Sequence, residues 1–332
     1  MSHTILVTAP TLAPAGLHRL QEAGCRLLFI QNPDSAAEVE HLLAAEPVDA
    51  VVSRTVALSA KAIACCPTLK VISKHGVGVS NIDVEAATQR RIPVYVTPGT
   101  NAQSVAEMTL GLMFAAARRI AWMDGELRRG NWSRAQDGLQ LGGRTLGLAG
   151  FGQIGQRVAA VCLALGMRVI AFDPALTGRS PVDSVEIASS LEELLAQSDV
   201  LSLHVPLTPA TRRMIGAPQL AMLPPDAIVI NTARGEVIDE AALIDALCAG
   251  RIFGAGLDTT EAEPLSSNSP LLNLPNVVLT PHAGGSTPAA LAAMASAAAG
   301  NVLSFLRGEY VDPAACVNPQ VFSRSSSTRG AV

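Results

Sequence analysis

The sequence is poor in aromatic and charged residues. Only 3% of its 332 residues are aromatic and 16% are charged, whereas 49% are hydrophobic. This balance is typical of a globular chain with large buried faces and excludes an intrinsically disordered one. The net charge is −4 and no basic run occurs, so we expect no nucleic-acid partner.

Cysteine is also scarce and is not arranged as in a metal site. The six cysteines form no Cys-x-x-Cys pair and no cluster with histidine at the spacing of zinc ligands. Most of them lie in apolar sequence, which favours buried, reduced thiols. We therefore expect no metal.

Targeting and membrane-spanning segments are missing from the pattern as well. The N-terminus enters a predicted strand at residues 5–8 without the charged start and apolar stretch of a signal peptide. The most apolar long segment, 105–117, contains Glu107 and is too short to cross a bilayer. These features predict a soluble cytoplasmic protein without a membrane partner.

The most informative stretch is Gly150-Phe-Gly-Gln-Ile-Gly155, which lies between a predicted buried strand, 146–149, and a predicted helix, 157–165. In such a turn Gly150 permits a tight reversal and Gly152 has no Cβ to block a pyrophosphate. Gly155 allows the helix to pack closely on the strand. The start of the helix offers free N–H groups and the positive end of its dipole to the anion.

A second predicted strand, 167–172, ends at Asp173. A carboxylate about 20 residues beyond the glycines is placed to bind the ribose 2′-hydroxyl of a dinucleotide. Its negative charge opposes the 2′-phosphate of NADP, so we predict NAD as the cofactor and NADP as less favoured. Arg179 follows six residues later, and its positive charge leaves NADP as an open alternative.

Strand-like and helix-like segments alternate along the chain. Five β-rich runs occur in the first hundred residues, and six more lie between residues 146 and 280. This alternation predicts α/β domains with parallel sheets covered by helices on both faces. The second group is complete without the first, so two doubly wound domains are expected. An alanine-rich helix, 286–306, is long enough to return to the first domain.

The segment 102–119 predicts a long helix that is apolar on nearly every face. Such a helix must be buried, and a subunit interface can bury part of it. The preceding Pro98-Gly-Thr-Asn101 is rich in helix-breaking residues and is predicted to be a hinge.

Several predicted strands are followed by residues that can take part in catalysis or binding. These are Arg234, Asp258 and His282, with Glu263 on the loop after Asp258. A histidine titrates near neutral pH and can move the proton that accompanies a hydride. A carboxylate beside it fixes its tautomer and stabilises the imidazolium. An arginine binds a substrate carboxylate through two parallel donors. These residue types are what the oxidation of a 2-hydroxy acid requires.

Two loops in the first hundred residues also follow predicted strands. The loop at Ser53-Arg54-Thr55 offers one guanidinium, and the loop from Lys74 to Asp83 contains two glycines that can bring N–H groups up to an anion. Either loop can equally be a surface turn with a solvated charge, so both interpretations stay open.

Taken together, these residues resemble the D-isomer-specific 2-hydroxyacid dehydrogenase family, and in particular its phosphoglycerate dehydrogenase and hydroxypyruvate reductase-like members. The resemblance covers nearly the whole chain. It rests on five motifs in order: the glycine turn with Asp173, and the segments 204–209, 231–235, 257–264 and 281–287.

The resemblance implies a Rossmann NAD-binding domain, residues 101–286, inserted in a flavodoxin-like substrate domain made of residues 1–100 and 287–332. It also implies a homodimer that acts on a small 2-hydroxy or 2-keto acid. Arg234 would bind the substrate carboxylate and carbonyl oxygen, His282 would be the acid/base and Glu263 its partner.

Further site residues are implied by the same resemblance. The implied substrate-binding residues are Arg54, Lys74, Val77, Gly78, Arg234 and His282. The implied cofactor-binding residues are Gly150, Gly152, Gln153, Ile154, Gly155, Asp173, His204, Val205, Pro206, Thr211, Thr232, Ala233, Arg234, Asp258, His282 and Gly284. Asp258 would approach the nicotinamide carboxamide.

The sequence departs from the family pattern at a few positions. Ser80 stands where an aspartate is common, and Thr260 stands where phenylalanine is frequent. The segment Pro281-His-Ala-Gly-Gly differs from the lactate-type pattern, which makes D-lactate less favoured.

The resulting prediction is an NAD-dependent dehydrogenase that acts on the CH–OH group of 3-phosphoglycerate or on the hydroxypyruvate/glyoxylate pair. For a phosphorylated substrate, Arg54 and Lys74 would be the phosphate ligands. Two alternatives remain open: a non-enzymatic NAD-binding regulator of corepressor type, and a formate or phosphite dehydrogenase on the same scaffold.

Overall fold

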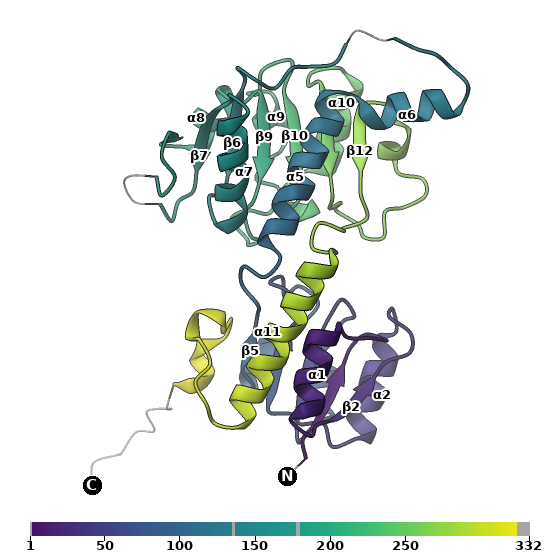
Figure 1. Cartoon of the computed structure of the whole chain (residues 1–332), viewed down its shortest axis with the longest axis vertical. Helices are drawn as coiled ribbons and strands as arrows, with labels where there is room; N and C mark the ends of the chain where they lie inside the picture. The colour runs from purple at the N-terminus through teal and green to yellow at the C-terminus, as the bar shows by residue number, and fades with distance from the viewer. Residues whose placement is uncertain (1, 135–136, 177–179, 324–332) are drawn as a thin grey trace. The chain divides into compact units, whose positions relative to one another are not determined.

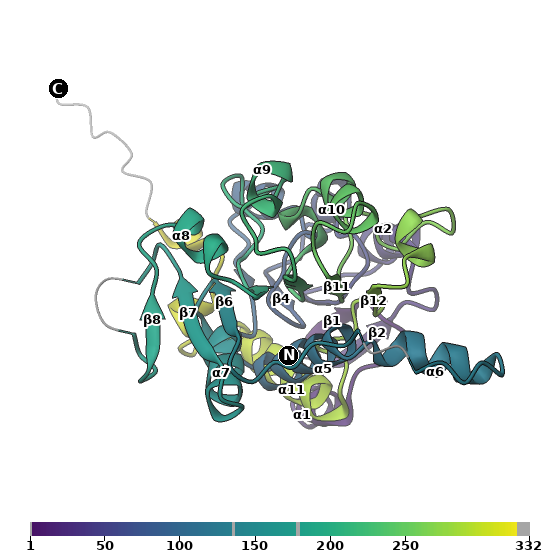
Figure 2. The ribbon, with the colours of Figure 1, turned by 90° about the horizontal axis from the view of Figure 1, so that it is seen from above.

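The computed structural model describes residues 2–134, 137–176 and 180–323, and the structural statements below refer to these residues. The chain divides into two compact units, one formed by Met1–Asn101 with Thr287–Val332 and the other by Ala102–Ser286. Each unit is built on one parallel sheet with helices on its faces (Figures 1 and 2).

The sheet of the first unit has the strand order β2-β1-β3-β4-β5, and every pairing is parallel. This is the order of the flavodoxin-like fold. Four of the strands, all except β2, are buried along their whole length, as is typical of a parallel sheet covered on both faces. The strands are β1 Thr4–Val7, β2 Arg26–Phe29, β3 Ala50–Ser53, β4 Val71–Lys74 and β5 Val94–Tyr95.

The C-terminal helix of this unit packs on α1, β3 and β4. The close approach of α1 depends on Gly16, because a Cβ there would lie 2.6 Å from the backbone oxygen of Ala295. The helices are α1 Pro14–Glu22, α2 Ala36–Ala45, α3 Ala60–Ala64, α4 Val84–Gln89 and α11 Pro288–Leu306, followed by the 3₁₀ turns η3 Pro313–Ala315 and η4 Pro319–Phe322.

Helix α11 is long and apolar enough to cross a membrane, and within the described ranges it alone meets that test. This helix differs from 105–117, the segment that the sequence pattern indicates as the most apolar. Core helices of globular proteins meet the same test. In α11, Ala295, Ala298 and Val302 are fully buried and belong to the hydrophobic core of the first unit.

The sheet of the second unit has the order β12-β11-β10-β9-β6-β7-β8. The chain starts at β6, winds outward to β8 and then returns to β9 beside β6, which is the Rossmann arrangement with an added strand. The predicted fold class is therefore confirmed. The strands are β6 Thr145–Ala149, β7 Arg168–Phe172, β8 Val185–Ile187, β9 Val200–Leu203, β10 Ile228–Asn231, β11 Gly254–Leu257 and β12 Val277–Leu279.

The prediction of six strands in this unit was wrong, because the sheet has seven. The missed strand, β8, has three residues and lies at the edge of the sheet beside β7. Its central residue, Glu186, is exposed and pairs with Arg168 on β7. So short and partly charged a run carries no strand pattern of its own.

Helices cover both faces of the second sheet. One core cluster includes side chains of α5 and α7, and another includes side chains of α8, α9 and α10. The helices are α5 Ala102–Ala117, α6 Ile120–Arg128, α7 Gln153–Ala164, α8 Leu191–Ala196, α9 Ala217–Leu220 and α10 Glu240–Cys248, with the 3₁₀ turns η1 Gly235–Val237 and η2 Pro270–Asn273.

Helix α5 is buried on one side within its own unit, and burial of the other side in a subunit interface stays a prediction. Val105, Thr109 and Leu112 are among its buried residues, whereas Glu107 and Phe114 are exposed. Every residue of α6 is at least partly exposed, and this helix extends away from its sheet (Figure 1).

Candidate active site

The glycine turn lies between β6 and α7 and has the geometry of an anion-binding loop. Gly150 has φ +92°, and a Cβ there would lie 2.7 Å from the carbonyl of His204. A Cβ at Gly155 would lie 2.7 Å from the backbone oxygen of Gly150, whereas nothing lies within 4 Å of one at Gly152. Two glycines thus permit close packing and the third leaves space beside the start of the helix, as a dinucleotide pyrophosphate requires.

Helix α7 begins at Gln153, four residues before the predicted start at Arg157. Its N-cap is Gly152, which has no side chain to accept the first N–H groups of the helix. These donors, from residues that include Gln153 and Ile154, therefore remain at the helix start near the open space beside Gly152.

Asp173 directly follows β7 and is tied to the glycine turn. Its Oδ2 accepts from the N–H of Phe151 at 2.9 Å, and its Oδ1 accepts from the N–H of Ala175 at 2.9 Å. The carboxylate is partly exposed, and each oxygen keeps acceptor capacity for a hydroxyl group. Arg179, the cation considered beside it, lies outside the described residues.

The end of β9 places His204 against the glycine turn. Its Nε2 lies 2.9 Å from Ser202 Oγ, while Nδ1 is buried and has no hydrogen-bond partner within the described part of the chain. The residue as a whole is only partly buried, yet burial of the ring lowers the pKa of His204 to about 4. The ring is therefore neutral near pH 7.

The loop after His204 carries Val205, Pro206 and Thr211. The hydroxyl of Thr211 donates to the backbone oxygen of Pro206 at 2.6 Å and so holds this loop in a compact turn. The three residues are partly or fully exposed.

The end of β10 is held by Asn231, the first residue of the motif 231–235, which is absent from the predicted site residues. Its Nδ2 donates to the oxygen of Arg234 at 2.8 Å, and its Oδ1 accepts from the N–H of Ala233 at 3.0 Å. The Thr232 hydroxyl lies 2.9 Å from that of Thr109 on α5. The guanidinium of Arg234 donates to the backbone oxygen of Ala233 at 2.5 Å.

Asp258, at the end of β11, organises the loop that carries His282. Only 2% of Asp258 is exposed. Its carboxylate accepts from the Thr280 hydroxyl at 2.6 Å and from the N–H groups of Ala283 and Gly284 at 2.8 Å each. These bonds occupy both oxygens, so the structure shows a loop-holding role, and contact with a nicotinamide stays a prediction.

His282 has a left-handed backbone with φ 50°, a conformation that is uncommon outside glycine. Its N–H donates to the backbone oxygens of Asp258 at 2.8 Å and Thr280 at 3.0 Å. The loop bonds of Asp258 thus hold His282 in a conformation that its own sequence does not favour.

His282 and Glu263 are 19 residues apart in the sequence but form a close pair, with 2.7 Å between Nδ1 and Oε2. The other carboxylate oxygen, Oε1, accepts from the N–H of Thr260 at 3.2 Å. Burial raises the pKa of Glu263, but the hydrogen bond to His282, the charge of His282, the Thr260 bond and the charge of Arg234 outweigh burial and hold the pKa below its usual range.

The loops of Arg234 and Glu263 meet at Gly235. A Cβ there would lie 1.9 Å from the carbonyl carbon of Thr260 and 2.4 Å from the nitrogen of Glu261. Only glycine allows this backbone contact. It brings together the three residues predicted as catalytic, Arg234, Glu263 and His282.

In the first unit, Lys74 is buried and holds two loops together. Its ammonium donates to the backbone oxygen of Arg54 and, at 2.5 Å, to Asn81 Oδ1. Asn81 in turn donates to the backbone oxygen of Val56 at 2.8 Å. The structure thus shows a structural role for Lys74, and its role as a phosphate ligand stays a prediction.

Arg54 differs from Lys74 because its guanidinium donates no hydrogen bond to any described residue, whereas the Lys74 ammonium donates to two oxygens. The residue is partly buried, and burial lowers the pKa of Arg54. The neighbouring loop presents Val77 and Gly78, whose N–H groups donate to no other group in the described chain. Val77 is 48% exposed, so both N–H groups remain candidates for binding an anion.

No group of three or more His, Cys, Asp or Glu side chains within the described ranges has the arrangement of a metal site. The acid–base pair and the glycine turn instead form a set of donors and acceptors suited to a dinucleotide and a small acid.

Comparison with known proteins agrees with this chemistry. The family model described as "D-isomer specific 2-hydroxyacid dehydrogenase, NAD binding domain" matches residues 110–284. A D-3-phosphoglycerate dehydrogenase of Methanocaldococcus jannaschii is 47% identical over 247 residues, which are 74% of this chain and 47% of that protein. The chain thus spans about half the length of that relative.

A second relative is similar in length. The hydroxypyruvate reductase of Thermotoga maritima is 45% identical over 245 residues, or 72% of this chain and 79% of that protein. Among solved structures, the TT0316 protein from Thermus thermophilus has a TM-score of 0.85 and 38% identity, over 95% of this chain and 99% of the other.

The environment of His75 in the first unit predicts a pH-dependent stability. Burial, the charge of Arg54 and, less strongly, that of Lys74 lower the pKa of His75 to about 4. An unfolded histidine titrates near 6.5, so the unfolded chain binds more protons in the window between the two values. We expect the free energy of unfolding to fall by roughly 3 kcal/mol as the pH is lowered through this window.

Urea unfolding at pH 7 and pH 4.5 measures this contribution. The variant His75→Gln should lose less stability than the wild type over that interval, while His18→Gln, which removes an exposed histidine of the same unit, should behave like the wild type. An equal loss in the wild type and His75→Gln would contradict the assignment.

Proposed function

The chain belongs to the D-isomer specific 2-hydroxyacid dehydrogenase family, and we propose that it transfers a hydride between a nicotinamide and C2 of a small D-2-hydroxy acid or 2-keto acid. The observation that carries this proposal is the pair of His282 and Glu263, joined at 2.7 Å, with the charge of Arg234 near Glu263. One edge of the sheet thus provides a proton donor, its carboxylate partner and a cation for the substrate.

In the reduction of a 2-keto acid, the imidazolium of His282 gives the proton on Nε2 to the carbonyl oxygen. Nδ1 keeps its hydrogen bond to Glu263, which remains a carboxylate and stabilises the imidazolium. A bound nicotinamide supplies the hydride to C2, or accepts it in the reverse direction. In oxidation, neutral His282 takes the hydroxyl proton. Arg234 binds the substrate carboxylate through parallel N–H donors.

The second unit is an NAD(P)-binding domain, and we propose NAD as its preferred cofactor. The space beside Gly152 fits a pyrophosphate, and the partly exposed carboxylate of Asp173 fits the adenosine ribose. Its negative charge opposes a 2′-phosphate. The remaining cofactor contacts proposed are those of Gln153, Ile154, Val205, Pro206, Thr211, Thr232, Ala233 and Gly284, with His204 and Asp258 shaping their loops.

We propose that the first unit is the substrate domain and that the substrate is 3-phosphoglycerate or the hydroxypyruvate/glyoxylate pair. Relatives named for both substrate classes support this choice. The N–H groups of Val77 and Gly78 would bind a carboxylate. Arg54 is the cation proposed for a phosphate, because Lys74 is bonded to the backbone of Arg54 and to Asn81.

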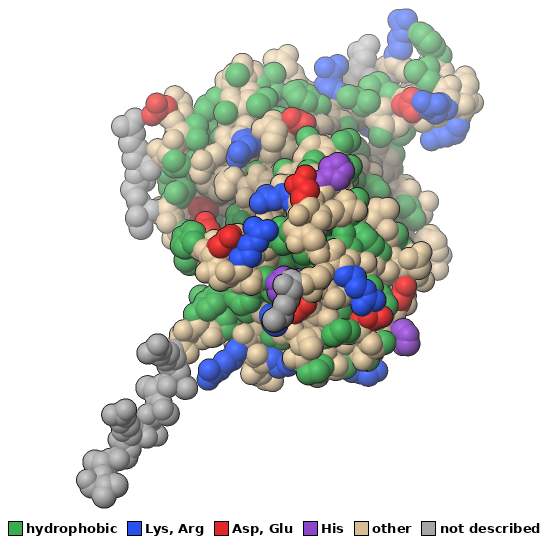
Figure 3. Space-filling model, turned by 60° about the horizontal axis from the view of Figure 1, so that its bottom comes forward, with side chains coloured by type: hydrophobic (Ala, Val, Ile, Leu, Met, Phe, Trp, Pro, Cys, Tyr) green, Lys and Arg blue, Asp and Glu red, His purple; other side chains and the backbone are tan. Residues whose placement is uncertain are grey.

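We propose that the protein works as a cytoplasmic enzyme without nucleic-acid or membrane partners. The net charge of −4 supports this. On the face shown in Figure 3, acidic and basic side chains are interspersed, in contrast to the continuous basic surface that nucleic acid requires.

A homodimer through the region of α6 is also part of the proposal. Ile120 and Leu127 are 50% and 54% exposed, and Trp132, just beyond the helix, is 76% exposed. Large apolar side chains gathered on one projecting segment are typical of an interaction surface.

The proposed reaction predicts turnover with a panel of 3-phosphoglycerate, hydroxypyruvate, glyoxylate, D-lactate and branched 2-keto acids, followed by NADH absorbance. We expect activity with the phosphorylated acid or with the hydroxypyruvate/glyoxylate pair, and little with D-lactate. Bound NAD without turnover on any member, and none on formate or phosphite, would favour the regulator of corepressor type.

Replacement of His282 should remove the proton transfer. We expect His282→Ala to lower kcat by about 10²–10⁴-fold, the usual contribution of a general acid/base, while NADH still binds. Fluorescence titration of NADH and steady-state kinetics separate the two effects, with His41→Ala as an exposed-histidine control. Unchanged turnover of His282→Ala would refute its role.

Removal of the charge of Asp173 should weaken the preference for NAD. We expect Asp173→Ala and Asp173→Asn to lower the ratio of kcat/KM for NAD to that for NADP by roughly tenfold or more, as for loss of a hydrogen bond to a charged group. The asparagine side chain can still accept from the N–H of Phe151. This variant therefore removes the negative charge while it keeps the hydrogen bond that holds the loop. Identical ratios in the wild type and both variants would contradict the prediction.

A further inference from the structure

We infer that Glu240 is a positioning residue for the Glu263–His282 pair and acts through the backbone N–H of Glu261. This inference rests on the proposed function, because that pair is the proposed acid–base group. Glu240 itself touches none of the reacting atoms in this role.

The contact that carries the inference joins α10 to the loop after β11. Glu240 is the first residue of α10, and its Oε2 accepts from the N–H of Glu261 at 2.9 Å. The N–H of the preceding residue, Thr260, donates to Glu263 Oε1. The bond from Glu240 therefore fixes the backbone immediately beside the donor that orients Glu263.

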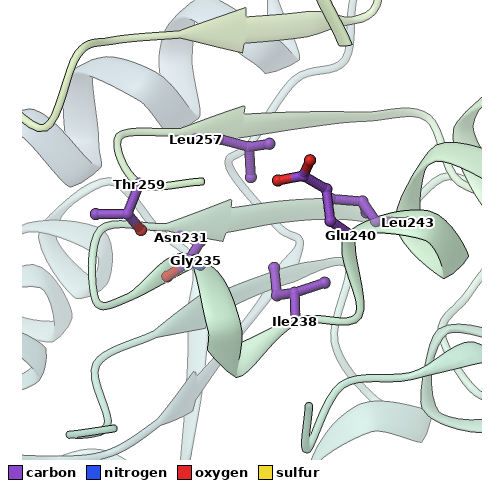
Figure 4. A pocket seen from close by; sticks show the side chains of 7 residues that line it. All are labelled: Asn231, Gly235, Ile238, Glu240, Leu243, Leu257 and Thr259. Carbon is purple, nitrogen blue, oxygen red and sulfur yellow. The ribbon is translucent and has the colours of Figure 1, made fainter. Parts of the chain in front are cut away.

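A small cavity lies beneath this loop (Figure 4). Its volume is about 10 Å³, and its lining includes Gly235, Leu257, Thr259 and Glu240, the charged residue of the set. The hydroxyl of Thr259 is buried and has no hydrogen-bond partner among the described residues. The Glu240 carboxylate thus lies beside a small space next to this loop, and its hydrogen bond to the Glu261 N–H is a directional restraint there.

Two other contacts link Thr260 and Glu261 to the rest of the chain, and each is weaker or acts in one direction. Glu261 forms an ion pair with Arg213 at 2.6 Å, but the Arg213 side chain is 56% exposed and such pairs contribute little. The contact of Gly235 with Thr260 prevents closer approach but does not hold the loop in place. Glu240 is thus the attractive contact on the buried side.

Loss of this contact should change the titration of His282. The groups that face the His282 loop are the carboxylate of Glu263 on Nδ1, the charge of Arg234 near Glu263, and Asp258, which accepts the His282 N–H through its backbone oxygen. If the loop shifts, Glu263 moves away from Nδ1 and the imidazolium loses stabilisation. Reduction of a keto acid needs that imidazolium, so its activity should then disappear at a lower pH.

The experiment measures the His282 titration midpoint by NMR in the protein without ligand, together with the pH profile of keto-acid reduction. We expect Glu240→Ala to lower the midpoint by about half a pH unit or more and to lower kcat roughly tenfold or more, with NADH affinity unchanged. Glu240→Gln should restore most of both, because its amide oxygen can still accept from the Glu261 N–H.

Matched variants separate positioning from a general effect of charge. Glu192→Ala removes an exposed acidic residue from the first turn of α8 in the same unit and should leave both readouts at wild-type values. Glu263→Gln should lower the midpoint further than Glu240→Ala, and the double variant should equal Glu263→Gln alone, because both changes act through one interaction. If Glu240→Ala fails to fold, Glu240→Asp should show a smaller shift in the same direction.

An unchanged His282 midpoint in a folded Glu240→Ala would overturn the inference, as would equal effects of the alanine and glutamine variants. Failure of the proposed function is a separate result. It would appear as absence of turnover in the wild type, while the NMR titrations would still decide whether Glu240 positions the pair.

Discussion

The active site depends first on a backbone contact between two loops. Gly235 lies so close to Thr260 and Glu261 that a Cβ would be 1.9 Å from a carbonyl carbon. This approach places the loop of Arg234 beside the loop of Glu263, so that the charge of Arg234 acts on that carboxylate. Without it, the carboxyl ends of β10 and β11 would carry the same residues but not one site.

A second constraint is that polar side chains at the carboxyl ends of β10 and β11 form hydrogen bonds with the backbone groups of the loops there. Asn231 bonds both ends of the turn at Ala233 and Arg234, and Asp258 accepts from the loop that holds His282 in a left-handed conformation. Loop N–H and C=O groups near a sheet edge would otherwise be buried without partners, which costs more than most single contacts contribute.

The need of buried polar groups for hydrogen-bond partners also explains the bonds of Lys74 and Asp258. Both residues were predicted to bind ligands, and in the structure both hold loops. Lys74 and Asp258 are charged and nearly fully buried, and a buried charge is tolerated only when hydrogen bonds replace its hydration. Lys74 obtains them from Arg54 and Asn81, and Asp258 from Thr280, Ala283 and Gly284. Residue type and position at a strand end alone do not reveal this loop-holding role.

The sequence by itself determined the fold class, most element positions and the glycine turn, because these depend on periodicity and turn chemistry within short segments. It missed β8 and did not show which side of α5 lies outside the core of its own unit, since an edge strand and a helix face are defined by what packs beside them. The resemblance to the family implied that Glu263 is the partner of His282, and the structure supplied the geometry of that pair. Only the tertiary structure decided the contacts that hold the loops: Lys74 with the backbone oxygen of Arg54, and Glu240 with the Glu261 N–H. Each of these contacts joins different loops or elements, so its geometry follows from the sheet and its packing rather than from any local pattern.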